Sequence, residues 1–100
     1  MLKPKGRRPR TRPNAGAGPD WLAEPFEDAI QETARRFVIN LKSAIDSRFA
    51  GESGRTIAGI LEVDHNSLRK ILAGVSYPDL VFIVRMETKF DQRLWPGRVR

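Results

Sequence analysis

The sequence predicts a small all-α domain of four helices, two of which form a helix-turn-helix, preceded by a disordered basic arm. Three observations predict this fold class. After residue 25, apolar residues recur at spacings of three and four, which is the period of a helix and not of a strand. Short stretches that contain Gly, Ser, Asp or Pro separate these periodic segments. The first 19 residues are instead rich in Lys, Arg, Pro and Gly and contain almost no large apolar residue.

Size and charge set the broad class. A chain of 100 residues is long enough for one domain with a single core. It contains no cysteine, which excludes disulfides and thiolate metal sites. No apolar run approaches the roughly 20 residues that span a bilayer, and no secretory signal is evident, so we expect a cytoplasmic protein. The net charge of +6 resides entirely in the first 19 residues, because the rest has 12 Lys or Arg and 12 Asp or Glu. Such asymmetry indicates a polyanionic partner.

We expect residues 1–19 to be a disordered arm. Its four prolines oppose helix formation, and its few apolar side chains cannot stabilise a fold. Its cations are Lys3, Lys5, Arg7, Arg8, Arg10 and Arg12. The helical domain is expected to span residues 20–97, and residues 98–100 to form a flexible C-terminus.

The first helix is predicted to begin within residues 24–26, where Pro25 suits the first turn. Its apolar positions are spaced by three or four residues: Phe26, Ile30, Ala34, Phe37, Leu41, Ile45 and Phe49. Gly51 and Gly54 bracket its end. Its extra N-terminal turns could fill the core or form a dimer face, and Trp21 could dock on the domain or remain exposed. The sequence leaves both alternatives open.

Two short helices follow, joined by a tight turn. Ser53 is the expected N-cap of a helix over 55–61, and Asp64 that of a helix over 65–73. Gly74 is placed directly after the latter, where a left-handed conformation favours glycine. The residues of the former helix that we expect to face mostly inward are Ile57, Ala58, Ile60 and Leu61.

The fourth helix is expected to follow Asp79, which can cap it. Its predicted apolar face consists of Leu80, Phe82, Ile83 and Met86. Phe90 and Trp95 are expected to close the core, and Pro96 and Gly97 to end the ordered chain. We find neither an internal repeat nor a strand pair. The expected class is therefore all-α, with four helices and short connections between them.

The two short helices have the character of a helix-turn-helix. Ala58 lies where the helices cross and only a small side chain fits, and Val63 closes the turn from inside. Leu68 and Ile71 anchor the second of the two helices to the core. Its outward side chains are then His65, Asn66, Arg69 and Lys70. A helix of about ten residues is about 15 Å long, enough to place its N-terminal part in a DNA major groove.

The stretch 54–74, GRTIAGILEVDHNSLRKILAG, resembles the helix-turn-helix of phage-repressor and Cro-like regulators of the XRE type. The runs 77–80 (YPDL) and 94–96 (LWP) are similar to actinobacterial or actinophage members, and the similarity covers 41–96. One position departs from the family, which usually has Gly in the turn where this chain has Glu62. That position tends to need a positive φ, which Glu adopts at a cost.

The resemblance implies a sequence-specific transcriptional regulator, a phage or bacterial repressor, that binds double-stranded DNA and is associated with the nucleoid of a bacterial host. It also implies a homodimer on two half-sites about one helical turn apart. Bases would be contacted by His65, Asn66, Arg69 and Lys70, since Asn pairs with adenine and Arg or Lys with guanine. Phosphates would be contacted by Ser53, Arg55, Ser67 and Tyr77.

The arm resembles an AT-hook, whose core is Arg-Gly-Arg-Pro, although the order here is Gly6-Arg7-Arg8-Pro9. Extended Arg-rich backbone fits a narrow minor groove, where the potential is most negative. We therefore expect the six cations of the arm to contact the minor groove while the third helix reads the major groove, as in homeodomains.

Other functions compete with this one. The polar helix face could be plain solvated surface and the arm a solubilising tail. An architectural protein that coats DNA with little sequence preference needs only the arm. An antitoxin or adaptor would bind a protein partner through the first helix.

An enzyme is not expected. Asp64, His65 and Ser67 are close in sequence but point to different faces of one short helix, which excludes a catalytic triad. His65 is the only histidine, and there is no cysteine to complete a metal site with it. We therefore expect no cofactor, no small-molecule substrate and no membrane partner.

Overall fold

The computed structural model describes residues 12–97. It contains four α-helices and one short 3-10 helix, with no strand in this part of the chain. The elements are η1 (Gly18–Asp20), α1 (Ala29–Phe49), α2 (Gly54–Leu61), α3 (His65–Leu72) and α4 (Leu80–Phe90). The predicted all-α class with four helices is confirmed.

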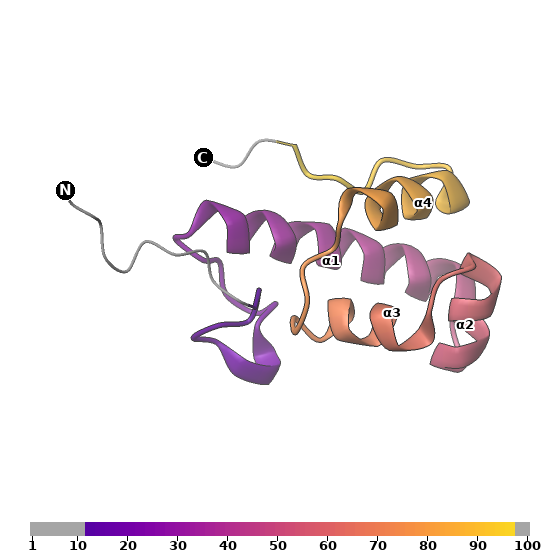
Figure 1. The fold of residues 1–100 in the computed structure, drawn as a ribbon, viewed down its shortest axis with the longest axis horizontal. Coiled ribbons are helices and arrows are strands. Elements are labelled where there is room, and N and C mark those ends of the chain that lie inside the picture. Colours follow the sequence, from indigo (N-terminus) through magenta and orange to yellow (C-terminus); the bar gives the residue numbers. More distant parts are fainter. Residues whose placement is uncertain (1–11, 98–100) are drawn as a thin grey trace.

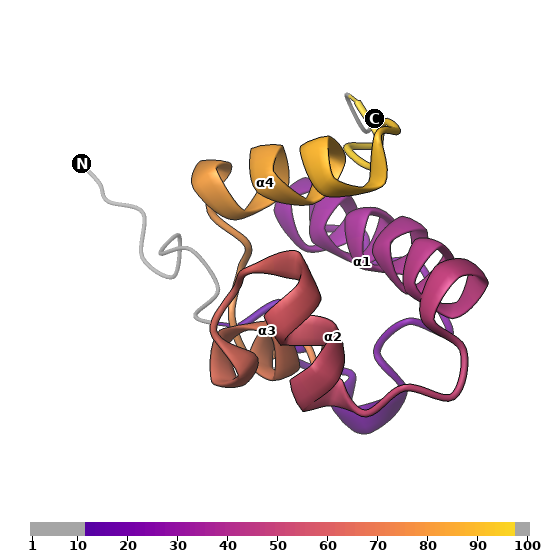
Figure 2. The same cartoon turned by 90° about the vertical axis from the view of Figure 1, so that its right-hand side faces the viewer.

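The long helix α1 is the axis around which the other elements pack. Figure 1 shows α4 along one side of α1 and α3 along the other, with α2 near the C-terminal end of α1. Turned by 90°, Figure 2 shows α2 and α3 as a crossed pair, with α4 on the other side of the view. The two short helices therefore form a unit of their own on one side of the domain.

One hydrophobic core joins α1 to the other helices. Phe37, Val38 and Leu41 of α1 are completely buried, as are Met86 of α4 and Leu94 beyond it. The Phe37 and Phe82 rings pack edge to face, with their centroids 6.3 Å apart. The central part of the predicted apolar series of α1 is thus correct, because Ala34, Phe37, Leu41 and Ile45 are all buried.

The beginning of α1 differs from the prediction. The helix starts at Ala29, because Asp28 caps it by accepting a hydrogen bond from the Gln31 amide at 2.8 Å. The Phe26 amide instead donates to Glu32 Oε1 at 2.8 Å, which holds the chain before the cap outside the helix. With this start Ile30 is 57% exposed, so it does not extend the apolar series as predicted.

Three other apolar residues lie further out than predicted. Ile60 is 49% exposed and Leu80 is 74% exposed. Each lies two residues from a buried position of its own helix, Ala58 or Phe82, and two residues rotate a side chain about 200° around a helix. Trp95 is 40% exposed and lies at the edge of the core, whereas Phe90 is buried as predicted.

Residues 12–19, predicted to be disordered, pack on the domain instead. Pro13 is completely buried, and the Asn14 amide donates to the Gly74 carbonyl at 3.0 Å. Trp21 docks on the domain and is 2% exposed, which decides the alternative that the sequence left open. The packed part of the chain thus begins before residue 20. The remainder of the predicted arm and residues 98–100 lie outside the described residues.

Candidate nucleic-acid interface

Side-chain caps set the start of both short helices. Ser53 Oγ accepts a hydrogen bond from the Thr56 amide at 3.1 Å, and Asp64 Oδ2 accepts one from the Ser67 amide at 2.9 Å. The bond from the Ser67 amide also lowers the pKa of Asp64, so this cap stays ionised at neutral pH. Both predicted N-caps are confirmed, and they fix where the backbone of α2 and α3 begins.

The turn between α2 and α3 is left-handed at Glu62, with φ 60° and ψ 43°. A positive φ is the conformation expected at this position, and here Glu62 adopts it. Contacts from α4 hold the residue in place: Arg85 Nη1 donates to the Glu62 carbonyl at 2.8 Å, and Lys89 Nζ lies 3.2 Å from Glu62 Oε1. The Val63 amide donates to the Ala58 carbonyl at 3.0 Å and closes the turn.

The inner faces of α2 and α3 are apolar and closely packed. Ala58 is 2% exposed where the sequence requires a small residue, and Leu68 and Ile71 are buried as predicted. His65, at the start of α3, lies against the start of α2, because a Cβ added at Gly54 would be 3.0 Å from its Nε2. The imidazole is therefore partly covered, which restricts its predicted role in contacting bases.

The outer face of α3 is polar and accessible. Asn66, Ser67, Arg69 and Lys70 are exposed. Arg69 Nη2 donates to Asn66 Oδ1 at 3.2 Å, so these two side chains form one polar group on the helix surface. Of the four residues predicted to contact bases, three thus share an exposed face, and His65 lies at its edge.

The residues predicted to contact phosphates fall into two places. Ser53 and Arg55 are exposed at the start of α2, beside the backbone amides of its first turn, of which that of Thr56 already donates to Ser53 Oγ. Ser67 and Tyr77 line a hollow between α3 and α4 together with Lys70. The Tyr77 hydroxyl is buried, because its ring packs against the core, so this residue does not offer that group to a phosphate as predicted.

The charge of this domain differs from that of the whole chain. Residues 12–97 contain 11 Lys or Arg and 12 Asp or Glu, so they carry no positive excess. Several of the arginines donate hydrogen bonds within the domain. Arg48 Nη1 donates to the Lys89 carbonyl at 3.2 Å, and Arg93 Nε donates to the Trp95 carbonyl at 3.1 Å. Arg12 alone of the predicted arm cations is described, and it is exposed.

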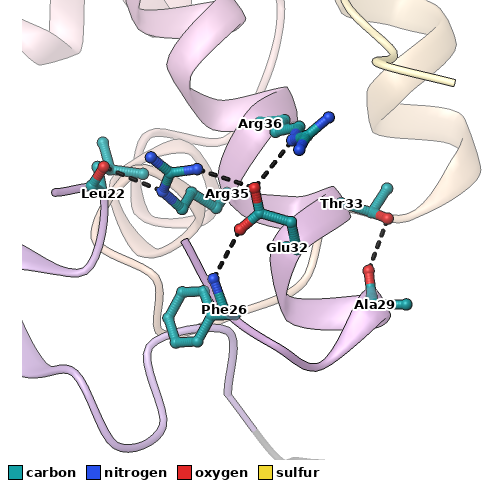
Figure 3. A network of polar contacts seen from close by, with 7 residues as sticks. All are labelled: Leu22, Phe26, Ala29, Glu32, Thr33, Arg35 and Arg36. Atoms are coloured by element: carbon teal, nitrogen blue, oxygen red, sulfur yellow. Dashed lines mark hydrogen bonds and ion pairs between the residues drawn. The ribbon is translucent and has the colours of Figure 1, made fainter. Parts of the chain in front are cut away.

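Sequence reasoning missed a buried carboxylate near the start of α1 (Figure 3). Glu32 is 3% exposed, and its Oε2 accepts from Arg35 Nη1 at 2.9 Å and from Arg36 Nε at 2.8 Å. Burial by itself would raise the pKa of Glu32, but the Phe26 amide, the bond to Arg36 and the two positive charges outweigh it and lower the pKa. The spacing of Glu32 from two arginines on one helix is the signal that could have indicated this network.

Within residues 12–97, no three His, Cys, Asp or Glu side chains come together as ligands for a metal ion. Over the same residues, none of the helices combines the length and the apolar character needed to cross a bilayer.

Comparison with protein-family models, with curated proteins and with solved structures finds no significant match to this chain.

Proposed function

We propose that the chain is a sequence-specific regulator of transcription that binds double-stranded DNA through the Cro-like, XRE-type helix-turn-helix that its sequence resembles. The observation that carries the proposal is the pair α2–α3, in which Leu68 and Ile71 bury one face of α3 while the opposite face is polar and exposed. The protein acts in the cytoplasm as a phage or bacterial repressor.

In this proposal, α3 enters the major groove. Asn66 pairs with the N6 and N7 groups of adenine, and Lys70 donates to guanine O6 and N7. Arg69 supports Asn66 through the hydrogen bond of 3.2 Å between them and leaves its other donors for a neighbouring base or phosphate. His65 lies at the edge of the contact.

Phosphate contacts set the orientation of α3 and carry no sequence information. The start of α2 supports such a contact, because Ser53 and Arg55 are exposed beside its first-turn amides. Since residues 12–97 carry no positive excess, the long-range attraction to DNA comes from the arm, whose cations lie in the minor groove.

A protein-binding function is the second candidate. Three apolar side chains of α4 are strongly exposed: Leu80 (74%), Val81 (64%) and Val84 (52%). Such a strip is typical of a contact with another protein, either a second copy of this chain or the partner of an antitoxin or adaptor. A stable complex with a protein partner, with no DNA binding even at low salt, would favour this candidate.

The proposal is tested by comparing affinities for a duplex selected from random DNA and for unselected duplexes at one salt concentration. Asn66→Ala and Lys70→Ala should each weaken binding to the selected duplex by about 1–3 kcal/mol and leave binding to unselected DNA nearly unchanged. Lys42→Ala is the matched control, because it removes an exposed cation from α1, outside the helix-turn-helix. Equal losses on both duplexes would assign Asn66 and Lys70 to phosphates and refute their role in reading sequence.

A further inference from the structure

Three apolar side chains lie on the outer side of α4, away from the core. Leu80, Val81 and Val84 are 74%, 64% and 52% exposed, whereas Phe82 and Met86 on the inner side of the same helix are buried. A helix that is apolar on both sides is typical of one whose outer side contacts another molecule. We call Leu80, Val81 and Val84 the ridge.

An apolar groove lies directly beside the ridge. It has a volume of about 660 Å³, and its walls include Ile30 and Ala34 of α1, Ile83 of α4, and Trp95. None of the described residues that line it carries a charge. Figure 1 shows the yellow segment after α4 running back along α1 toward the N-terminal end of that helix. The Trp95 amide donates to Glu87 Oε2 at 2.7 Å, which holds this wall of the groove in place.

The ridge and the groove share one face of the domain. Leu80 is three residues before Ile83, which lines the groove, and four residues before Val84 of the ridge, so its side chain neighbours both on the surface of α4. A face that carries a projection beside a depression is complementary to its own copy. In a two-fold contact each copy places its ridge in the groove of the other, and the assembly closes as a dimer.

The charges beside the ridge do not oppose such a contact. Arg85 and Lys89 lie next to the ridge on α4. Arg85 Nη1 donates to the Glu62 carbonyl at 2.8 Å, and Lys89 Nζ lies 3.2 Å from Glu62 Oε1. Both cations are thus directed toward the turn between α2 and α3, and two copies can approach without bringing these positive charges together.

The exposed apolar area sets the strength of the contact. Full burial removes roughly 60–120 Å² of an aliphatic side chain from water and roughly 150–250 Å² of an aromatic one. From the exposed fractions of Ile30 (57%), Trp95 (40%) and the ridge, each copy offers about 200–400 Å² of apolar surface. Since homodimer interfaces are about 65% apolar, two copies would bury about 600–1200 Å² in all, the lower end for a specific interface. A dimer formed in this way is weak and depends on concentration.

We infer that this face binds a second copy of the chain, with the ridge of each copy seated in the groove of the other. The inference goes beyond the proposed function, because the contact forms without DNA. None of the described residues of the ridge or the groove belongs to α2 or α3, so the contact leaves the exposed face of α3 free. If the proposed function holds, the dimer presents two copies of α3 to one duplex, each to its own half-site.

The test is sedimentation equilibrium of the full chain at rising concentration. The native chain should shift from 11.3 kDa to twice that mass, with no larger species. Leu80→Glu on the ridge and Ile30→Lys in the groove should each weaken the dimer by at least about 30-fold, because a two-fold contact counts each substitution twice. Both replaced side chains are more than half exposed, so the variants keep the fold, which circular dichroism checks. Ile60→Glu is the matched control, because Ile60 is 49% exposed on α2, outside both surfaces, and this variant should dimerise as the native chain does.

Mixing the two variants tests whether the ridge of one copy meets the groove of the other. In a mixed dimer, the new carboxylate on the ridge of Leu80→Glu enters the groove that carries the new ammonium of Ile30→Lys. The second ridge-and-groove contact of the same dimer is native. The mixture should therefore dimerise at least about tenfold more tightly than either variant alone.

The inference is overturned if the native chain stays at 11.3 kDa at every concentration, which would leave the ridge to a different protein. It is also overturned if species larger than two copies accumulate, if either variant dimerises as the native chain does, or if the mixture dimerises no better than the separate variants. None of these measurements involves DNA. Absence of the dimer therefore leaves the proposed function standing, and failure to distinguish selected from random duplexes leaves the dimer standing.

Discussion

Replacing Glu32 with Gln should destabilise the domain at neutral pH, and the loss should disappear in acid. The carboxylate is 3% exposed and accepts three hydrogen bonds, from the Phe26 amide and from the side chains of Arg35 and Arg36. Gln can keep an acceptor for the Phe26 amide, but its NH₂ group and lost charge leave the two arginines without their counter-ion. The substitution therefore breaks the network of Figure 3 without emptying its space.

The magnitude follows from how exposed the partners are. Removing one partner of a fully buried ion pair costs about 3–5 kcal/mol. The side chain of Arg35 is 15% exposed and that of Arg36 is 51% exposed, so water solvates part of the charge that Glu32→Gln leaves behind. We therefore expect a loss of about 1–3 kcal/mol in the free energy of unfolding at pH 7.

The pH dependence has a definite sign. The pKa of Glu32 is lower in the folded chain than its ordinary value of 4.5, so the unfolded chain takes up the proton first as the pH falls. The stabilisation by Glu32 is complete above this ordinary value and is lost as the pH falls through the pKa of the folded state. The difference between the native chain and Glu32→Gln should thus be constant from pH 7 to about 5 and shrink below that.

The assay is urea unfolding followed by circular dichroism at a series of pH values, for the native chain, Glu32→Gln and Glu27→Gln. Glu27 is exposed, so its variant serves as the control for loss of one surface carboxylate close to Glu32. Asp64 and Glu87, whose pKa values are also lowered, contribute equally to all three proteins and cancel in the difference. A stability gap that does not change with pH, or no gap at pH 7, would refute the reasoning.

Two further predictions concern the turn and the arm. Glu62→Gly should raise the free energy of unfolding by about 0.5–1 kcal/mol, because Gly adopts the left-handed φ without strain. This gain exceeds the two costs of the substitution, which are the loss of the exposed ion pair with Lys89 and the greater flexibility of the unfolded chain. A lower urea midpoint would contradict this prediction. Deleting residues 1–11 removes five cations and should flatten the slope of log affinity against log salt by about 4–5 units; an unchanged slope would exclude the arm from DNA contact.

The elements that sequence predicted well are those set by neighbours within three or four residues. Ser53, Asp64 and Asp79 each cap the helix that follows, and each accepts a hydrogen bond from the amide three residues ahead. Gly74 has the positive φ expected directly after α3. These features depend on local backbone geometry, which a residue type and its position specify.

The features that sequence did not predict depend on contacts between distant residues. The Trp21 indole bonds to a carbonyl 51 residues away, and Gln31 reaches back 18 residues to Pro13. The composition of residues 12–19 favours disorder. The residues that hold this segment in place, Gln31 and Gly74, lie far from it in the sequence, so a local pattern does not reveal them. Likewise, the spacing of apolar residues does not predict that Ile60 and Leu80 are exposed, since each fits the apolar pattern of its helix. Only the packing of the helices against one another decides which face is covered.

The most direct test of the central claim is selection of binding sites from a pool of random duplexes with the full chain at physiological salt. The account predicts a short enriched motif, and it predicts that Asn66→Ala and Lys70→Ala abolish or change the enrichment at one or two positions while Lys42→Ala does not. A chain that retains DNA yet returns a pool with no enriched motif would contradict sequence-specific recognition by α3.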